Sequence, residues 1–156
     1  MSIINQKIRV LVVDDSMVAR GMIMQGLSAH PRIEVIGCAI NTMDAKTKIA
    51  ALKPDVVTMD VEMPGKSGLE FLREYIPQHP LPVILVSSLN LRVFDALDAG
   101  AVDFVQKPQN HGDRDVFITA LTQKVIIAAS AKVRMAQPAV SAAATQLEGI
   151  GTRTMY

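Results

Sequence analysis

The amino-acid sequence predicts an α/β protein, a three-layer sandwich in which helices cover both faces of a parallel β-sheet. Five short apolar runs rich in β-branched residues alternate, along the 156 residues, with longer segments of helical apolar spacing. These runs are apolar on both faces, as is typical of strands buried between two layers of helices. Such an alternation favours parallel strands joined by right-handed crossovers. The length suits a single domain of this class.

The predicted strands are short, and several of them end at polar or turn-forming residues. The first run stops at Asp14 and Asp15, and the third stops at Asp60, before a loop that contains Pro64 and Gly65. We expect β-strands over residues 8–13, 33–39, 55–60, 82–87 and 101–106.

The segments between these runs place apolar residues at intervals of three and four, which is the period of an amphipathic helix. We expect α-helices over residues 16–29, 42–52, 67–76 and 91–99, and a long final helix from residue 113 onward. The expected N-terminal caps are Asp15 or Ser16 for the first helix, Thr42 for the second and Asp113 for the last. Residues 125–131 are more apolar than one buried stripe needs, so this segment either packs deeper or contacts a partner, for example in a homodimer.

The composition changes towards the C-terminus. Residues 137–156 are rich in Ala, Ser, Thr, Gly and Pro and keep no apolar periodicity. We therefore predict a folded domain over residues 1–136 and a linker or disordered tail over residues 137–156. Because so few residues follow residue 136, we expect no DNA-binding domain there.

Charge and composition exclude several classes of protein. Sixteen basic residues oppose fifteen acidic ones, which gives no general case for binding nucleic acid or a membrane surface. No apolar run approaches the roughly 18 residues that a bilayer span requires, and residues 1–7 do not form a secretory signal. The single cysteine excludes an intrachain disulfide framework. We expect a cytoplasmic protein with neither a nucleic-acid nor a membrane partner.

Polar residues collect where the predicted strands end. Asp14 and Asp15 follow the first strand, Asp60 ends the third, Ser87 ends the fourth and Lys107 follows the fifth. The carboxyl ends of parallel strands share one edge of the sheet, which is where ligands bind in such folds. Clustered carboxylates are costly unless a cation compensates them, and Mg²⁺ is the hard cation that prefers a few carboxylates.

This set of side chains suits phosphoryl transfer. An aspartate can act as a nucleophile and become an acyl phosphate, while lysine and Mg²⁺ neutralise the transferring group. We expect Asp60 to be the acceptor, because it stands alone at the end of a central strand. The adjacent pair fits metal binding better, with Asp15 on the metal directly and Asp14 bound directly or through water.

The chain resembles the receiver domain of two-component response regulators. The resemblance rests on LVVDDS at residues 11–16, DVEMP at 60–64 with Gly68, Ser87, and FVQKP at 104–108, and it extends over about residues 7–130. It implies the flavodoxin-like (CheY-like) fold, with a five-stranded parallel sheet in the order 2-1-3-4-5.

The resemblance also implies a phosphorylation chemistry. Asp60 would accept phosphate from a histidine kinase. Mg²⁺ would be held by Asp14, Asp15, Asp60 and the backbone carbonyl of Glu62. In this family Mg²⁺ is thus the expected cofactor.

Three further residues would contact the phosphoryl group or move in response to it. Lys107 would pair with the phosphoryl group, and the Lys107–Pro108 bond would be cis. Ser87 would move to meet the phosphate, and Phe104 would be the aromatic switch that turns inward when it does. Such a movement is a two-state shift that phosphorylation biases.

A narrower resemblance is to the receiver half of chemotaxis protein-glutamate methylesterases, on residues 55–64, 68–72, 86–89 and 100–105. It implies a chemotaxis-type kinase and an output domain or partner, a methylesterase, that the receiver inhibits until it is phosphorylated. The chain itself carries no esterase site, so we expect no enzyme activity of that kind from it. Its spacing from Ser87 to Lys107 is a few residues shorter than in the family, in a region that receivers commonly use to signal.

Three alternatives remain. The chain could be a stand-alone receiver of another pathway. It could be a small aspartyl-phosphate phosphatase or phosphotransferase, although Glu62 stands where that family places a second aspartate. It could be a flavin carrier, but carboxylates at residues 14–15 would repel the flavin phosphate without Mg²⁺.

Overall fold

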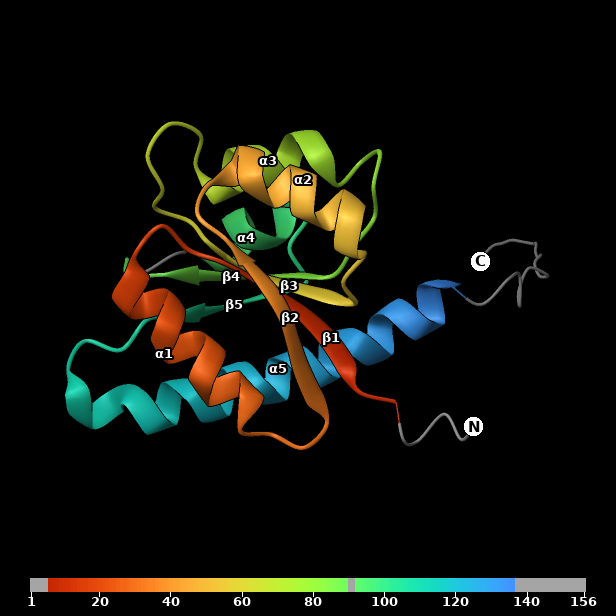
Figure 1. Ribbon diagram of the computed structural model, residues 1–156. Helices are drawn as coiled ribbons and strands as arrows, with labels where there is room; N and C mark the ends of the chain where they lie inside the picture. The colour runs from red at the N-terminus through yellow and green to blue at the C-terminus, as the bar shows by residue number, and fades with distance from the viewer. Residues whose placement is uncertain (1–5, 90–91, 137–156) are drawn as a thin grey trace.

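The computed structural model describes residues 6–89 and 92–136. Five parallel strands form one sheet in the order β2-β1-β3-β4-β5, which confirms the predicted fold class and strand order. Figure 1 shows α1 and α5 together on one face of this sheet and α2, α3 and α4 on the other. The predicted tail at 137–156 lies outside the described residues.

The strands are close to the predicted ones. Their bounds are β1 Ile8–Val13, β2 Ile33–Ala39, β3 Val56–Asp60, β4 Val83–Ser87 and β5 Asp103–Gln106. Every residue of β3 and β4 is buried, which is why these segments are apolar at successive positions. The fifth strand begins later than expected because the amide of Ala101 donates to the carbonyl of Ala96 at the end of a helix.

The helices also follow the prediction, with differences at their ends. Their bounds are α1 Met17–Ser28, α2 Thr42–Leu52, α3 Gly68–Tyr75, α4 Val93–Ala99 and α5 Arg114–Ala136, with a short 3₁₀ turn at His111–Asp113. Residue 91, where the fourth helix was predicted to begin, lies outside the described residues. In the described part of the chain, none of the helices combines the length and apolarity that a membrane span requires.

Two of the predicted caps are wrong. Asn41, and not Thr42, caps α2, since its side chain accepts from the amide of Asp44 at 2.8 Å. Asn110 caps the 3₁₀ turn that precedes α5, so Asp113 lies inside that turn. Asparagine is at least as good a cap as the residue predicted in each case, and the backbone path decides which one is used. Ser16 caps α1, which was one of the two residues predicted.

Two apolar cores lie on opposite faces of the sheet. Along β1, Leu11 and Val13 pack under α2 to α4, while Val10 and Val12 pack under α1 and α5. The apolar stripe of the last helix is buried in the second core, at Phe117, Leu121, Val125 and Ala128. Ile127 on the same helix is 66% exposed, so part of the apolar surplus faces solvent, and a homodimer contact stays a prediction.

Candidate functional site

The carboxyl ends of four strands bring the predicted residues together. Asp14 follows β1, Asp60 and Ser87 end β3 and β4, and Lys107 follows β5. The register pairs Asp60 with Val86, one residue before Ser87, and the Lys107 amide donates to the Ser87 carbonyl at 2.7 Å. Asp14, Asp60 and Ser87 are all at most 2% exposed, so three polar side chains are buried at this edge.

Three carboxylates converge at this edge. Asp14, Asp15 and Asp60 each offer one oxygen, and these oxygens lie within 4.8 Å of one another. Asp14 and Asp60 are buried, whereas Asp15 is exposed. Oxygen ligands of one octahedral Mg²⁺ ion, each at about 2.1 Å, lie about 3 to 4 Å apart. The three carboxylates are therefore close enough to share such an ion after small movements of their side chains.

Lys107 is the cation that faces the buried carboxylates. Its Nζ lies 2.9 Å from Oδ2 of Asp14 and 3.4 Å from Oδ1 of Asp60. Burial lowers the pKa of Lys107, but the hydrogen bonds and charges of the two aspartates outweigh this effect and raise its pKa overall. The side chain is therefore held in its charged form between them.

One lysine does not neutralise the whole cluster. Burial, followed by the charge of Asp14, raises the pKa of Asp60 to about 7, although Lys107 acts in the opposite direction. The site, with three carboxylates and one lysine, therefore has an excess of negative charge unless a second cation binds. This excess is what a divalent ion beside Asp15 would compensate.

Asp14 is anchored by its own surroundings. Its Oδ1 accepts from the amide of Ser16 at 2.9 Å, and its backbone carbonyl accepts from the guanidinium of Arg20 at 2.9 Å. Arg20 was not singled out from the sequence. Its position one turn into α1 is the only signal that could have pointed to it.

The side chain of Glu62 also takes part in this edge, a role that was not predicted from the sequence. Its Oε2 accepts from the Ser87 hydroxyl at 2.5 Å, and its Oε1 accepts from the amide and the hydroxyl of Ser88, both at 2.9 Å. Burial raises the pKa of Glu62, but the hydrogen bonds from Ser87 and Ser88 together outweigh it and hold the pKa below its ordinary value. The carboxylate is therefore charged and engaged with the end of β4.

Gly68 lets α3 begin directly against the backbone of Asp60. A Cβ at this position would lie far inside van der Waals contact with the Asp60 carbonyl oxygen and 3.2 Å from Cα of Val61. The Gly68 amide also donates to the Val61 carbonyl at 3.0 Å. The start of α3 therefore helps to position the candidate phosphoacceptor.

The region after β5 corrects one prediction. No cis peptide bond occurs in the described part of the chain, so the prediction of a cis Lys107–Pro108 bond is wrong. The trans form is the one that X–Pro bonds generally prefer. Phe104 is half-buried and packs against the core beneath α2 to α4, and its switch role stays a prediction.

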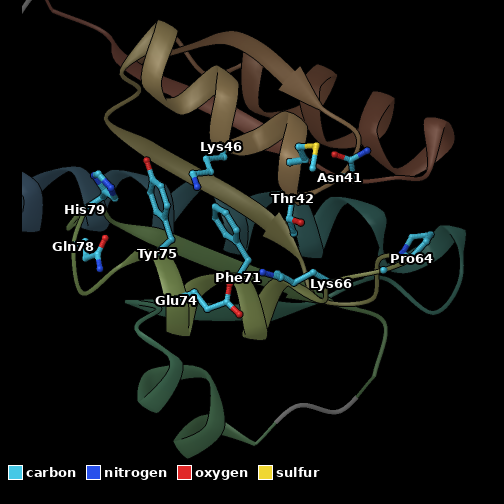
Figure 2. Close-up of a pocket in the computed structure, with 12 residues that line it drawn as sticks. Asn41, Thr42, Lys46, Pro64, Lys66, Phe71, Glu74, Tyr75, Gln78 and His79 are labelled. Carbon is cyan, nitrogen blue, oxygen red and sulfur yellow. Dashed lines mark hydrogen bonds and ion pairs between the residues drawn. The ribbon is translucent and has the colours of Figure 1, made fainter.

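A separate hollow of about 540 Å³ lies between α2 and α3 (Figure 2). On its α3 side, the ring of Tyr75 stacks between Phe71 and His79, with centroid separations of 4.9 and 4.6 Å. An ion pair between Lys66 and Glu74 lies at its edge. None of the residues predicted for the phosphorylation chemistry lines it.

Comparison with known proteins identifies the family. The response regulator receiver domain matches residues 10–122, which is most of the chain. The chain belongs to this family. Membership of this family explains the fold, the strand order and the cluster of polar residues at the carboxyl edge of the sheet.

Individual relatives show which kind of receiver this chain resembles. The receiver is 47% identical over 130 residues to a protein-glutamate methylesterase/protein-glutamine glutaminase of Syntrophomonas wolfei, a match that covers 82% of this chain and 38% of the relative. The chain therefore spans well under half the length of that protein. Among solved structures, the response regulator domain of Thermotoga maritima CheB matches with a TM-score of 0.74 and 37% identity, over 80% of this chain and 98% of that one.

A second solved structure also resembles this chain. The CheX–CheY–BeF₃–Mg²⁺ complex of Borrelia burgdorferi matches with a TM-score of 0.67 and 26% identity, over 78% of this chain and 89% of that one. The chain is thus a receiver domain of the kind found in chemotaxis methylesterases, as the narrower resemblance predicted.

Proposed function

We propose that this receiver is phosphorylated on Asp60 by a histidine kinase in the presence of Mg²⁺, and that phosphorylation changes the conformation that controls an output domain. The observation that carries this proposal is the position of Asp60. Its carboxylate is buried at the end of a central strand, beside the Asp14–Lys107 ion pair and within 4.8 Å of the other two acidic side chains.

The residues that would hold Mg²⁺ are the carboxylates of Asp14, Asp15 and Asp60 and the backbone carbonyl of Glu62. When bound, Mg²⁺ would neutralise charge on the carboxylates and on the phosphoryl group. Burial is the largest cause of the raised pKa of Asp60, and the charge of Asp14 is the next. That second cause supports the assignment, because a bound cation would offset the repulsion between the two carboxylates.

Phosphoryl transfer would form a bond between a carboxylate oxygen of Asp60 and phosphorus. The bond between phosphorus and the imidazole nitrogen of the kinase breaks, and that nitrogen takes a proton from solvent. The ammonium of Lys107, 3.4 Å from Oδ1 of Asp60, would place positive charge beside the incoming group. The hydroxyl of Ser87, at the end of the neighbouring strand, would then donate to a phosphoryl oxygen.

The output is proposed from the relatives. The named relatives accord with a chemotaxis-type histidine kinase as the phosphoryl donor and with a methylesterase as the controlled domain or partner. They also accord with a cytoplasmic setting. The phosphatase alternative has less support, because Glu62, at the position of the second acid, is already engaged by Ser87 and Ser88.

Intact-mass measurement after incubation with acetyl phosphate and Mg²⁺ tests the proposal. We expect one phosphoryl group on the wild type and on the control variant Asp98→Asn, which removes an exposed carboxylate of α4. We expect none on Asp60→Asn and none with EDTA present, and a higher Mg²⁺ requirement for Asp15→Asn. Labelling that persists in Asp60→Asn would refute the assignment.

A further inference from the structure

The hydroxyl expected to meet the phosphate is already bound to another anion. The Ser87 Oγ donates to Oε2 of Glu62 at 2.5 Å, in a side chain with no exposed surface. The same oxygen of Ser87 accepts from the amide of Leu89 at 3.0 Å. Both roles of the hydroxyl are thus used within the unphosphorylated protein.

A hydroxyl has a single proton and can donate it to one acceptor at a time. A phosphoryl oxygen on Asp60 can therefore receive this proton only if the bond to Glu62 breaks. Both acceptors are anionic, so the exchange replaces one charge-assisted hydrogen bond with another. The balance between the two acceptors then decides how readily Ser87 leaves its resting position.

Glu62 is well placed to hold that resting position. Its second oxygen accepts from both the amide and the hydroxyl of Ser88, so the carboxylate is fixed by three donors from the end of β4. Its own amide donates to Oδ1 of Asp60 at 3.3 Å, which keeps the residue beside the phosphoacceptor. The bonds to Ser88 can persist when Ser87 turns away, so the loop after β4 need not be released.

We propose that Glu62 is a positioning residue that competes with the phosphoryl group for the hydroxyl proton of Ser87, and so sets the free-energy difference between the resting and the phosphorylated conformations. This inference rests on the proposed phosphorylation of Asp60. It assigns the side chain of Glu62 a role distinct from the metal contact proposed for its backbone carbonyl.

Beryllofluoride, which mimics a phosphoryl group on aspartate, provides the test. Its affinity in the presence of Mg²⁺ is measured by calorimetry on the wild type, Glu62→Gln, Ser87→Ala and the double variant. Glu62→Gln should tighten binding by about tenfold, because a charged acceptor holds a hydroxyl more strongly than a neutral one by about that factor. In the Ser87→Ala background the same substitution should have no effect.

The cycle separates competition for the hydroxyl from simple charge repulsion. If Glu62 acted only by repelling the anion, its neutralisation would tighten binding equally with and without the Ser87 hydroxyl, and that result would overturn the proposal. Glu70→Gln is the matched control, because it removes an exposed carboxylate of α3 while a glutamine can still complete the capping box with Ser67. It should leave the affinity unchanged.

A second measurement does not depend on phosphorylation. In the metal-free protein, Glu62→Ala should speed hydrogen exchange at the amide of Ser88, because this amide donates a hydrogen bond to Oε1 of Glu62 in the structure. If no variant binds beryllofluoride, the wild type included, the proposed function fails. Unchanged exchange at Ser88 would then overturn the inference about Glu62 independently.

Discussion

Replacing Gly68 by alanine should destabilise the protein, whereas the same replacement at Gly21 should stabilise it. Both glycines are helical and neither has a positive φ angle, so backbone strain does not distinguish them. They differ in what a Cβ would meet. At Gly21, in the exposed middle of α1, no heavy atom other than those of the adjoining helix backbone lies within 4 Å of that position.

The magnitudes follow from these surroundings. Alanine in an open helix interior is favoured over glycine by about 1 kcal/mol, so Gly21→Ala should raise the free energy of unfolding by that amount. At Gly68 the new methyl group would overlap the carbonyl oxygen of Asp60, and backbone atoms cannot rotate away as a side chain can. Overpacking of this kind costs about 3 kcal/mol, so the two variants should differ by about 4 kcal/mol.

Gly26 provides an intermediate case. A Cβ there would lie 2.5 Å from Cδ1 and 2.8 Å from Cγ1 of Ile118, where α1 packs on α5. A side chain can shift in part, so the helix-propensity gain should offset some of the cost. We expect the free energy of unfolding of Gly26→Ala to lie between those of the other two variants.

Urea denaturation followed by far-ultraviolet circular dichroism measures all three variants, since the chain has no tryptophan for fluorescence. The three substitutions are chemically identical, so each serves as a control for the others. A Gly68→Ala protein as stable as Gly21→Ala would refute the steric reasoning. Because the overlap is with Asp60 itself, Gly68→Ala should also slow labelling by acetyl phosphate, measured on the folded fraction.

Three further predictions concern buried polar groups. Asp60→Asn should stabilise the metal-free protein by an amount that grows as pH rises from about 4 to about 7. Burial and the charge of Asp14 raise the pKa of Asp60 to about 7 in the folded protein. The wild type therefore loses stability over this window, as Asp60 loses its proton, whereas the variant does not. Denaturation at pH 4 and pH 8 measures this, and an equal effect at both pH values would contradict it; added Mg²⁺ should shrink the difference at pH 8. Lys107→Met should lower the free energy of unfolding of the metal-free protein at pH 7 by about 3 kcal/mol, because it leaves the carboxylate of Asp14 buried without its ion-pair partner. Urea denaturation at pH 7 tests this, and wild-type stability would count against it. Thr58→Val should be neutral or stabilising by up to about 1 kcal/mol, since the Thr58 hydroxyl is buried without a hydrogen-bond partner in the described part of the chain. Thermal unfolding checks it, and a clear loss of stability would mean that the hydroxyl has a partner.

Much of the fold could be predicted because parallel strands leave a strong pattern. Strands β3 and β4 are buried on both faces, so their sequences are apolar except for Thr58 and the residues at their ends. An aspartate or a serine marks the point where each strand reaches the sheet edge. The candidate site followed from the same pattern. Asp14, Asp60 and Lys107 could be placed together because parallel strands bring their carboxyl ends to one edge.

The caps were harder to predict because neighbouring residues compete for the same role. Asn41 and Thr42 are both favourable caps, and the direction in which the chain leaves β2 decides between them. The choice between Asp113 and Asn110 depended similarly on a 3₁₀ turn that no periodic pattern indicates. Such differences are small in energy, so they depend on surroundings that the local sequence does not specify.

By itself, the sequence determined the order of strands and helices along the chain, the burial of both faces of the sheet, and the cluster of acidic residues at its carboxyl edge. It could do so because apolar periodicity and strand-end residues are local properties. Only the tertiary structure decided what the side chain of Glu62 does. Its bonds to Ser87 and Ser88 join residues 25 and 26 positions apart, and they exist because β3 pairs with β4 in a particular register. A contact of this kind depends on the relative placement of two loops, which the pattern within either loop does not encode.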